Sequence, residues 1–209
     1  MQAGAQSPSS PLAEPGQPPG RGTYRGMLLK LARRPDALIP QVLAGVIGRS
    51  WHARGLQALP LYGIDLVRTR RVLARHFPGS ETLPALHAAV PEEHAEAIEM
   101  DDVVALLLEN LTRRDEDNEV LAHAVASACL GSDHLWQDMQ LASRRQLSEL
   151  MGNHFTTLAA RNAGDMKWKK FLYKQLCERE EIRVCKAPSC GVCTDYDVCF
   201  GPEEGAPAT

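Results

Sequence analysis

Apolar residues recur at intervals of three and four along this chain, and that spacing limits what the chain can fold into. The clearest stretch covers residues 144–161, where one apolar stripe consists of Leu147, Leu150, Met151, Phe155 and Leu158. Ser143 and Gln146 form a capping box at its start. No segment alternates apolar and polar residues as a strand does, and none repeats. The sequence therefore predicts an all-α fold, a helical bundle of about six or seven helices.

Turn residues bound the other predicted helices. These cover residues 24–32, 36–54, 65–77, 91–113, 116–130 and 166–178. Asp165 is expected to cap the last of them, whose inward face consists of Trp168, Phe171, Leu172 and Leu176. Both that helix and the one at 144–161 are amphipathic, so we expect each to pack against the rest of the bundle.

Composition divides the chain into three parts. Residues 1–22 are rich in Pro, Gly and Ser and are expected to be a disordered arm, residues 23–180 are the predicted helical domain, and residues 181–209 are an irregular cysteine-rich loop with an acidic tail. The longest apolar run, Val103–Leu108, is far shorter than a membrane span, and the first twenty residues lack a secretory signal. We therefore expect a cytoplasmic protein with no membrane partner.

Charge is unevenly distributed along the chain, although the net charge is only −3. Residues 21–75 carry eleven Lys or Arg against two acidic residues, whereas residues 81–119 carry twelve Asp or Glu against two Arg. The small net charge argues against bulk binding to nucleic acid. The simplest interpretation of the two blocks is a pair of solvated helix faces that attract each other.

Four cysteines lie within fifteen residues near the C-terminus, in the pattern Cys185-x4-Cys190-x2-Cys193-x5-Cys199. Pro188 and glycine and aspartate residues between them favour a loop in which all four sulfurs can turn toward one point. In a reducing compartment such a set is better interpreted as metal ligands than as disulfides.

Thiolates are soft ligands that select zinc, copper(I) or an iron–sulfur cluster, and the spacing alone leaves zinc and iron–sulfur open. The pattern is not that of a ferredoxin, because both outer gaps differ and Phe200 follows the last cysteine where proline would stand. A group of cations precedes the loop and would favour an anionic cluster or an oxyanion, although a solvated helix face explains each one as well: Lys167, Lys169, Lys170, Lys174, Arg183 and Lys186.

Four further side chains are candidate ligands for which a structural role is the simpler explanation. Cys177 is a possible spare ligand but is better explained as a half-buried thiol, and Cys129 as a core residue. His154, within the apolar stripe, is more simply a hydrogen-bonded core histidine, yet it is the best non-cysteine candidate for a further metal ligand. His134 ranks next, beside Asp133 as a helix cap and Trp136 as a packing residue.

Several segments together resemble the NifQ family of nitrogen-fixation proteins. They are the four-cysteine spacing, MKWKKFLYKQLCE before it, CFGPEE at its end, LARHFPG at 73–79, the stretch at 133–155 and LAARN at 158–162. The resemblance covers residues 55–204.

The resemblance implies an iron–sulfur protein that binds molybdenum and donates it to assembly of the nitrogenase iron–molybdenum cofactor. It assigns cluster binding to Cys185, Cys190, Cys193 and Cys199, and it implies two partners, the cofactor-assembly scaffold complex and the nitrogenase iron protein.

Motifs of common enzymes are missing from the sequence. The chain has no Gly-Lys of a phosphate-binding loop, no His-Glu-x-x-His and no Gly-x-Ser-x-Gly. A carrier rather than an enzyme is therefore expected, and the alternative is a helical adaptor protein with a structural four-cysteine zinc knuckle.

Overall fold

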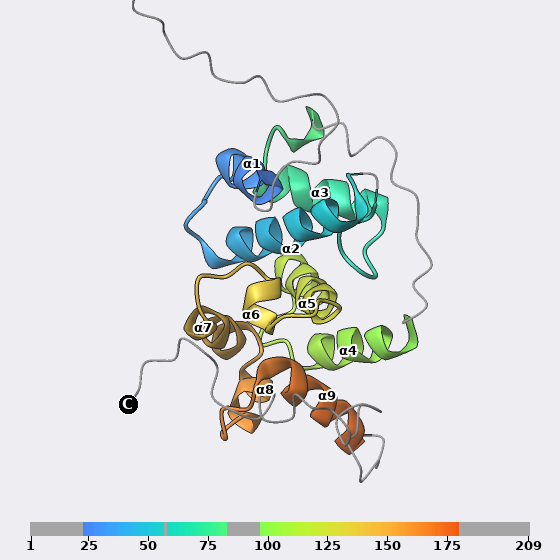
Figure 1. Ribbon diagram of the computed structural model, residues 1–209, viewed down its shortest axis with the longest axis vertical. Coiled ribbons are helices and arrows are strands. Elements are labelled where there is room, and N and C mark those ends of the chain that lie inside the picture. Colours follow the sequence, from blue (N-terminus) through green and yellow to red (C-terminus); the bar gives the residue numbers. More distant parts are fainter. Residues whose placement is uncertain (1–22, 57, 83–96, 180–209) are drawn as a thin grey trace, which may run out of the picture.

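The computed structural model describes residues 23–56, 58–82 and 97–179, which form helices and no strand (Figure 1). Their bounds are α1 Thr23–Leu31, α2 Leu38–Arg54, α3 Leu66–His76, the 3₁₀ helix η1 Ser80–Thr82, α4 Ala97–Glu109, α5 Glu116–Cys129, α6 Leu135–Asp138, α7 Arg144–His154, α8 Thr156–Arg161 and α9 Trp168–Arg179. The predicted all-α class is confirmed. The expected disordered arm and the four-cysteine loop lie outside the described residues.

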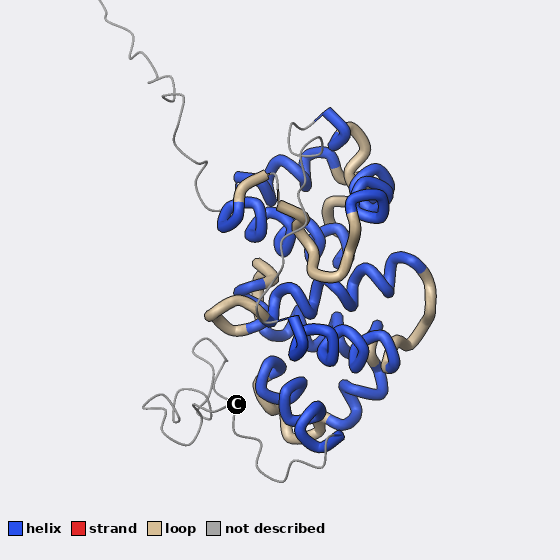
Figure 2. The backbone as a smooth tube through the Cα atoms, turned by 90° about the vertical axis from the view of Figure 1, so that its right-hand side faces the viewer, coloured by secondary structure: helices blue, strands red, loops and turns tan. Residues whose placement is uncertain are grey.

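Helix α5 forms the centre of the bundle. Every residue from Val120 to Ala126 is buried, and the helix packs against α2 on one side and α4 on another, as Figures 1 and 2 show from two directions. A helix that is apolar around its circumference must lie inside the fold. Helices α2, α4 and α6 cover parts of its surface, whereas α1 packs on α2 and α9 packs on α4.

Two glycines of α2 allow close packing on either side of that helix. A Cβ at Gly45 would meet the backbone carbonyl of Met139, and a Cβ at Gly48 would lie 2.7 Å from the backbone nitrogen of Arg25. The backbone of the loop after α6 and the backbone of α1 therefore lie in direct contact with α2 at these two glycines.

The predicted single helix over 144–161 is wrong. It is interrupted at Phe155, whose φ of −136° and ψ of 53° are not helical, so that α7 ends at His154 and α8 begins at Thr156. Phe155 is nevertheless fully buried. The apolar stripe thus continues through the break, which is why periodicity alone did not reveal it. Ser143 is confirmed as the N-cap of α7, because its Oγ accepts a hydrogen bond from the Gln146 amide.

Asp165 does not cap the last helix. It has a positive φ of 49°, and its carboxylate accepts a hydrogen bond of 2.8 Å from Nη1 of Arg144, while α9 begins three residues later at Trp168. The helix predicted to end at residue 113 ends at Glu109, and the short α6 was not predicted. Asp165 joins the start of α7 to the turn before α9 instead.

The two charge blocks attract each other as predicted. Arg68 of α3 contacts Glu119 of α5 at 2.6 Å, and Arg75 contacts Asp117 at 2.9 Å. Glu116 also pairs with the α3 arginines. Among the described residues no helix is long and apolar enough to cross a membrane.

Candidate functional site

The predicted ligands Cys185, Cys190, Cys193 and Cys199 lie outside the described residues. What the structure describes is α9, the helix that leads toward them. At its end, both Nη atoms of Arg179 lie 3.1 Å from the carboxylate oxygens of Glu109, the last residue of α4. The first of the four cysteines follows Arg179 by six residues.

Helix α9 is held to the bundle by aromatic packing. Trp168 and Phe171 are buried and meet edge to face, with ring centroids 5.7 Å apart, and the indole nitrogen of Trp168 donates to Oγ of Ser148 at 3.3 Å. Leu172 is fully buried and Leu176 partly so. The predicted inward face is confirmed, so the start of the cysteine segment is tied to a packed helix.

The lysines of α9 do not form one solvated face. Lys169 donates from Nζ to the Asp138 carboxylate and, at 2.7 Å, to the carbonyl oxygen of Gly131. Asp138 is fully buried and also lies 2.6 Å from Nη2 of Arg49. Lys169 is therefore part of a buried ion-pair group that joins α2, α6 and α9. Sequence reasoning missed this group, because nothing in the sequence links positions so far apart.

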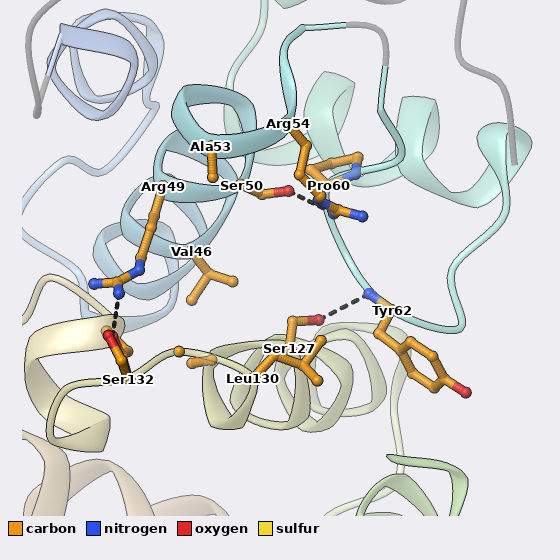
Figure 3. Close-up of a pocket in the computed structure, with 13 residues that line it drawn as sticks. Val46, Arg49, Ser50, Ala53, Arg54, Pro60, Tyr62, Ser127, Leu130 and Ser132 are labelled. Carbon is orange, nitrogen blue, oxygen red and sulfur yellow. Dashed lines mark hydrogen bonds and ion pairs between the residues drawn. The ribbon is translucent and has the colours of Figure 1, made fainter. Parts of the chain in front are cut away.

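Among the described residues, the pocket between α2 and the end of α5 has a volume of about 460 Å³. Figure 3 shows Arg49, Ser50 and Arg54 on α2 above it, Tyr62 on the loop to one side, and Ser127 and Leu130 below. The Ser127 hydroxyl accepts from the Tyr62 amide at 2.8 Å and donates to the His123 carbonyl at 2.7 Å. The lining of the pocket is therefore partly apolar and partly charged, and hydrogen bonds hold Tyr62 and Ser127 together on one side of it.

His154 is a half-buried residue at the end of α7, in contact with α5. Its Nδ1 lies 2.6 Å from Oδ1 of Asn118, and its carbonyl accepts from the Thr112 amide at 2.8 Å. Burial lowers the pKa of the imidazole, an effect that the Asp115 charge opposes. The hydrogen-bonded role predicted for His154 is confirmed.

The other candidate ligands of the sequence analysis, Cys177, Cys129 and His134, also lie in the described part of the chain. Cys177 is half-buried on α9, and Cys129 is buried on α5, where desolvation raises the pKa of its thiol to about 12. His134, not Asp133, is the N-cap of α6, and its amide donates to Oε1 of Gln137 at 3.1 Å. Asp133 instead lies 3.4 Å from Arg49, and Trp136 packs against the core as predicted.

The described residues contain no group of three or more His, Cys, Asp or Glu side chains arranged to hold a metal ion.

Comparison with known proteins identifies relatives over most of the chain. A family model described as NifQ matches residues 42–201. The chain is 41% identical over 162 residues to Protein NifQ of Azotobacter vinelandii, which covers 71% of this chain and 82% of that protein. It is 35% identical over 179 residues to Protein NifQ of Rhodobacter capsulatus, covering 82% and 96% respectively.

A third relative, a NifQ homolog of Sinorhizobium fredii strain NBRC 101917 / NGR234, is 37% identical over 150 residues, which cover 70% of this chain and 64% of that protein. No solved structure matches the chain. The family match spans more than half of the sequence and includes all four positions of the cysteine motif. The chain belongs to the NifQ family.

Proposed function

We propose that this protein is a carrier that binds an iron–sulfur cluster through Cys185, Cys190, Cys193 and Cys199, holds molybdenum in or beside that cluster, and donates it to assembly of the nitrogenase iron–molybdenum cofactor. Family membership supports a role in nitrogen fixation. The observation that carries the finer proposal is the compact four-thiolate set, which lies within the family-matched residues.

The chemistry of the donor set supports a sulfur-bridged cluster or another soft metal over a hard cation. Four thiolates can hold a four-metal cluster, or three of its metals with the fourth exchangeable. A carrier must release what it binds, and a metal segment at the end of a helical body fits that need. The body holds α9, the helix before that segment, through the buried side chains of Trp168, Phe171 and Leu172.

The proposed role is that of a donor rather than an enzyme, acting in the cytoplasm. The proposed acceptors are the cofactor-assembly scaffold complex and the nitrogenase iron protein. Delivery to either would be a transfer between two metal sites, so it would not need a catalytic group in the helical body.

Anaerobic purification followed by counting of iron, sulfide, molybdenum and zinc tests this proposal. We expect iron and sulfide together with molybdenum, loss of iron when Cys190 or Cys193 is changed to Ser, and no loss in the matched control Cys177→Ser. One zinc per chain without iron would support a structural zinc knuckle and contradict the carrier role.

A further inference from the structure

The pocket between α2 and the end of α5 has the size of a site for a small organic molecule. Its volume is about 460 Å³, within the range of about 300–1,000 Å³ that is usual for such sites. Five of the side chains that line it are apolar: Val46, Ala53, Pro60, Ala128 and Leu130. A tetrahedral inorganic anion would occupy only a small part of this space, so a ligand that fills the pocket must have an apolar body.

Two arginines of α2 lie at opposite ends of this apolar surface. Figure 3 shows Arg49 on one side, beside Ser132. Arg54 lies on the other side, beside Pro60, with Val46 between the two arginines. Because the arginines are five positions apart on a helix, their Cα atoms are separated by about 7.5 Å along its axis. The pocket therefore has a cation at each end and an apolar middle.

The charge of Arg49 is balanced within the protein. Its Nη2 lies 2.6 Å from Oδ1 of the buried Asp138 and 3.4 Å from Oδ2 of Asp133. Lys169 pairs with the same Asp138 carboxylate. These two cations and two carboxylates have no net charge together, so this end of the pocket has little attraction for a further anion.

Arg54 gives the pocket a net positive charge at the other end. The charged side chains that line the pocket are Arg49, Arg54 and Asp138, two cations and one anion. Nη2 of Arg54 donates to Oγ of Ser50 and to the carbonyl oxygen of Leu59, each at 2.6 Å. These two bonds fix the position of the guanidinium. A ligand that carries a negative charge is therefore favoured at this end.

The hydrogen-bonding groups that the lining still offers are donors. Oγ of Ser50 accepts from Arg54, and its own proton has no acceptor in the part of the chain that the structure describes. The acceptors are already used, because the Gly131 carbonyl accepts from Lys169 at 2.7 Å. The Ser127 hydroxyl accepts from one backbone amide and donates to a carbonyl one turn earlier. A complementary ligand must therefore supply acceptor atoms.

We propose that this pocket binds a small organic carboxylate. The carboxylate group lies at Arg54 and Ser50, and the apolar body lies against Val46, Ala53 and Leu130. A guanidinium suits a carboxylate because its planar set of N–H groups can donate two parallel hydrogen bonds to the two oxygens. The site is separate from the four cysteines, so failure of this proposal would leave the carrier function standing, and the reverse also holds.

Isothermal titration calorimetry of the full-length protein with four probes tests the class of ligand. The probes are hexanoate, its neutral analogue hexanamide, acetate, which lacks the apolar body, and sulfate. We expect hexanoate to bind at least about tenfold more tightly than each of the others, because only hexanoate combines charge-assisted hydrogen bonds with an apolar chain. Absence of hexanoate binding, equal binding of hexanamide, or equal binding of sulfate would overturn the proposal.

Variants test the location of the site. Arg54→Gln should weaken hexanoate binding about tenfold, and Arg54→Lys, which keeps the charge, should restore part of it. Ala53 is exposed, so Ala53→Phe can fill the apolar part of the pocket without entering the core, and it should abolish binding. The matched control Arg34→Gln removes an exposed charge outside the pocket and should bind hexanoate normally. Circular dichroism verifies that each variant is folded. Unchanged binding in either folded Arg54→Gln or folded Ala53→Phe would overturn the proposal.

Discussion

Asp138 and Lys169 form a buried ion pair, in which the fully buried carboxylate is shared between the Lys169 ammonium and, at 2.6 Å, the Arg49 guanidinium. Three helices that do not follow one another in sequence meet at this one side chain. A Cβ at Gly131 would collide with the same carboxylate, so the loop after α5 also closes around it.

Removing that negative charge should destabilise the bundle. We expect Asp138→Asn to lower the free energy of unfolding by about 2–4 kcal/mol, because two cations would be left without their buried partner. Urea unfolding followed by circular dichroism measures this. The matched control is Asp133→Asn, which removes a charge that also faces Arg49. The Asp133 side chain is 51% exposed and its contact with Arg49 is longer, at 3.4 Å, so this substitution should change stability by less than about 0.5 kcal/mol. Equal effects of the two substitutions would contradict the role given to Asp138.

The two helix glycines Gly45 and Gly152 should respond in opposite directions to alanine. Gly45→Ala places a methyl group against the Met139 carbonyl and should cost about 1–3 kcal/mol. A Cβ at Gly152 would meet nothing within 4 Å, so Gly152→Ala should stabilise α7 by up to about 1 kcal/mol through its higher helix propensity. Thermal unfolding of both variants gives the signs, and a stabilised Gly45→Ala would show that α6 does not pack there.

Acidification should weaken the fold through His123. Its Nδ1 lies 2.9 Å from the Tyr62 carbonyl, and desolvation lowers its pKa from the ordinary 6.5. Because the unfolded chain binds the proton more readily, stability is complete above about pH 6.5 and falls as the pH drops toward the lower pKa of the folded state. His76 and His154 shift in the same direction. The urea concentration at the midpoint of unfolding should decrease as the pH is lowered through this range. His123→Gln should make that midpoint less dependent on pH, and an unchanged dependence would exclude His123 as its cause.

The two described cysteines should differ in reactivity. Cys129 is 6% exposed and its thiol has a pKa of about 12, so iodoacetamide should leave it unmodified in the folded protein. Half-buried Cys177 should react faster. Mass spectrometry of peptides from native and urea-treated protein measures both rates, and rapid native labelling of Cys129 would mean that the core opens there.

The sequence predicted the helical class and most helix positions because apolar stripes have a helical period, as along α7 and α9, and because turn residues bound the other helices. It could not predict the break at Phe155, since that residue keeps its place in the stripe while its backbone leaves the helix. Asp165 has the residue type of a cap, but Arg144 competes for its carboxylate. Such competition between distant residues leaves no local pattern.

For the candidate site, too, the sequence predicted the features that depend on neighbouring residues and missed those that depend on distant ones. His154 could be singled out from its place among apolar residues, but its hydrogen bond with Asn118 joins positions 36 residues apart and leaves no local pattern. The ion pair of Lys169 with Asp138 likewise joins positions 31 residues apart. The four cysteines were evident because their ligand chemistry is local, encoded within fifteen residues.

The most direct measurement is the metal content of anaerobically purified protein beside its Cys190→Ser and Cys177→Ser variants. The carrier account predicts iron, sulfide and molybdenum in the unaltered protein and in Cys177→Ser, and loss of all three in Cys190→Ser. Zinc at one per chain with no iron, or iron retained in Cys190→Ser, would contradict it.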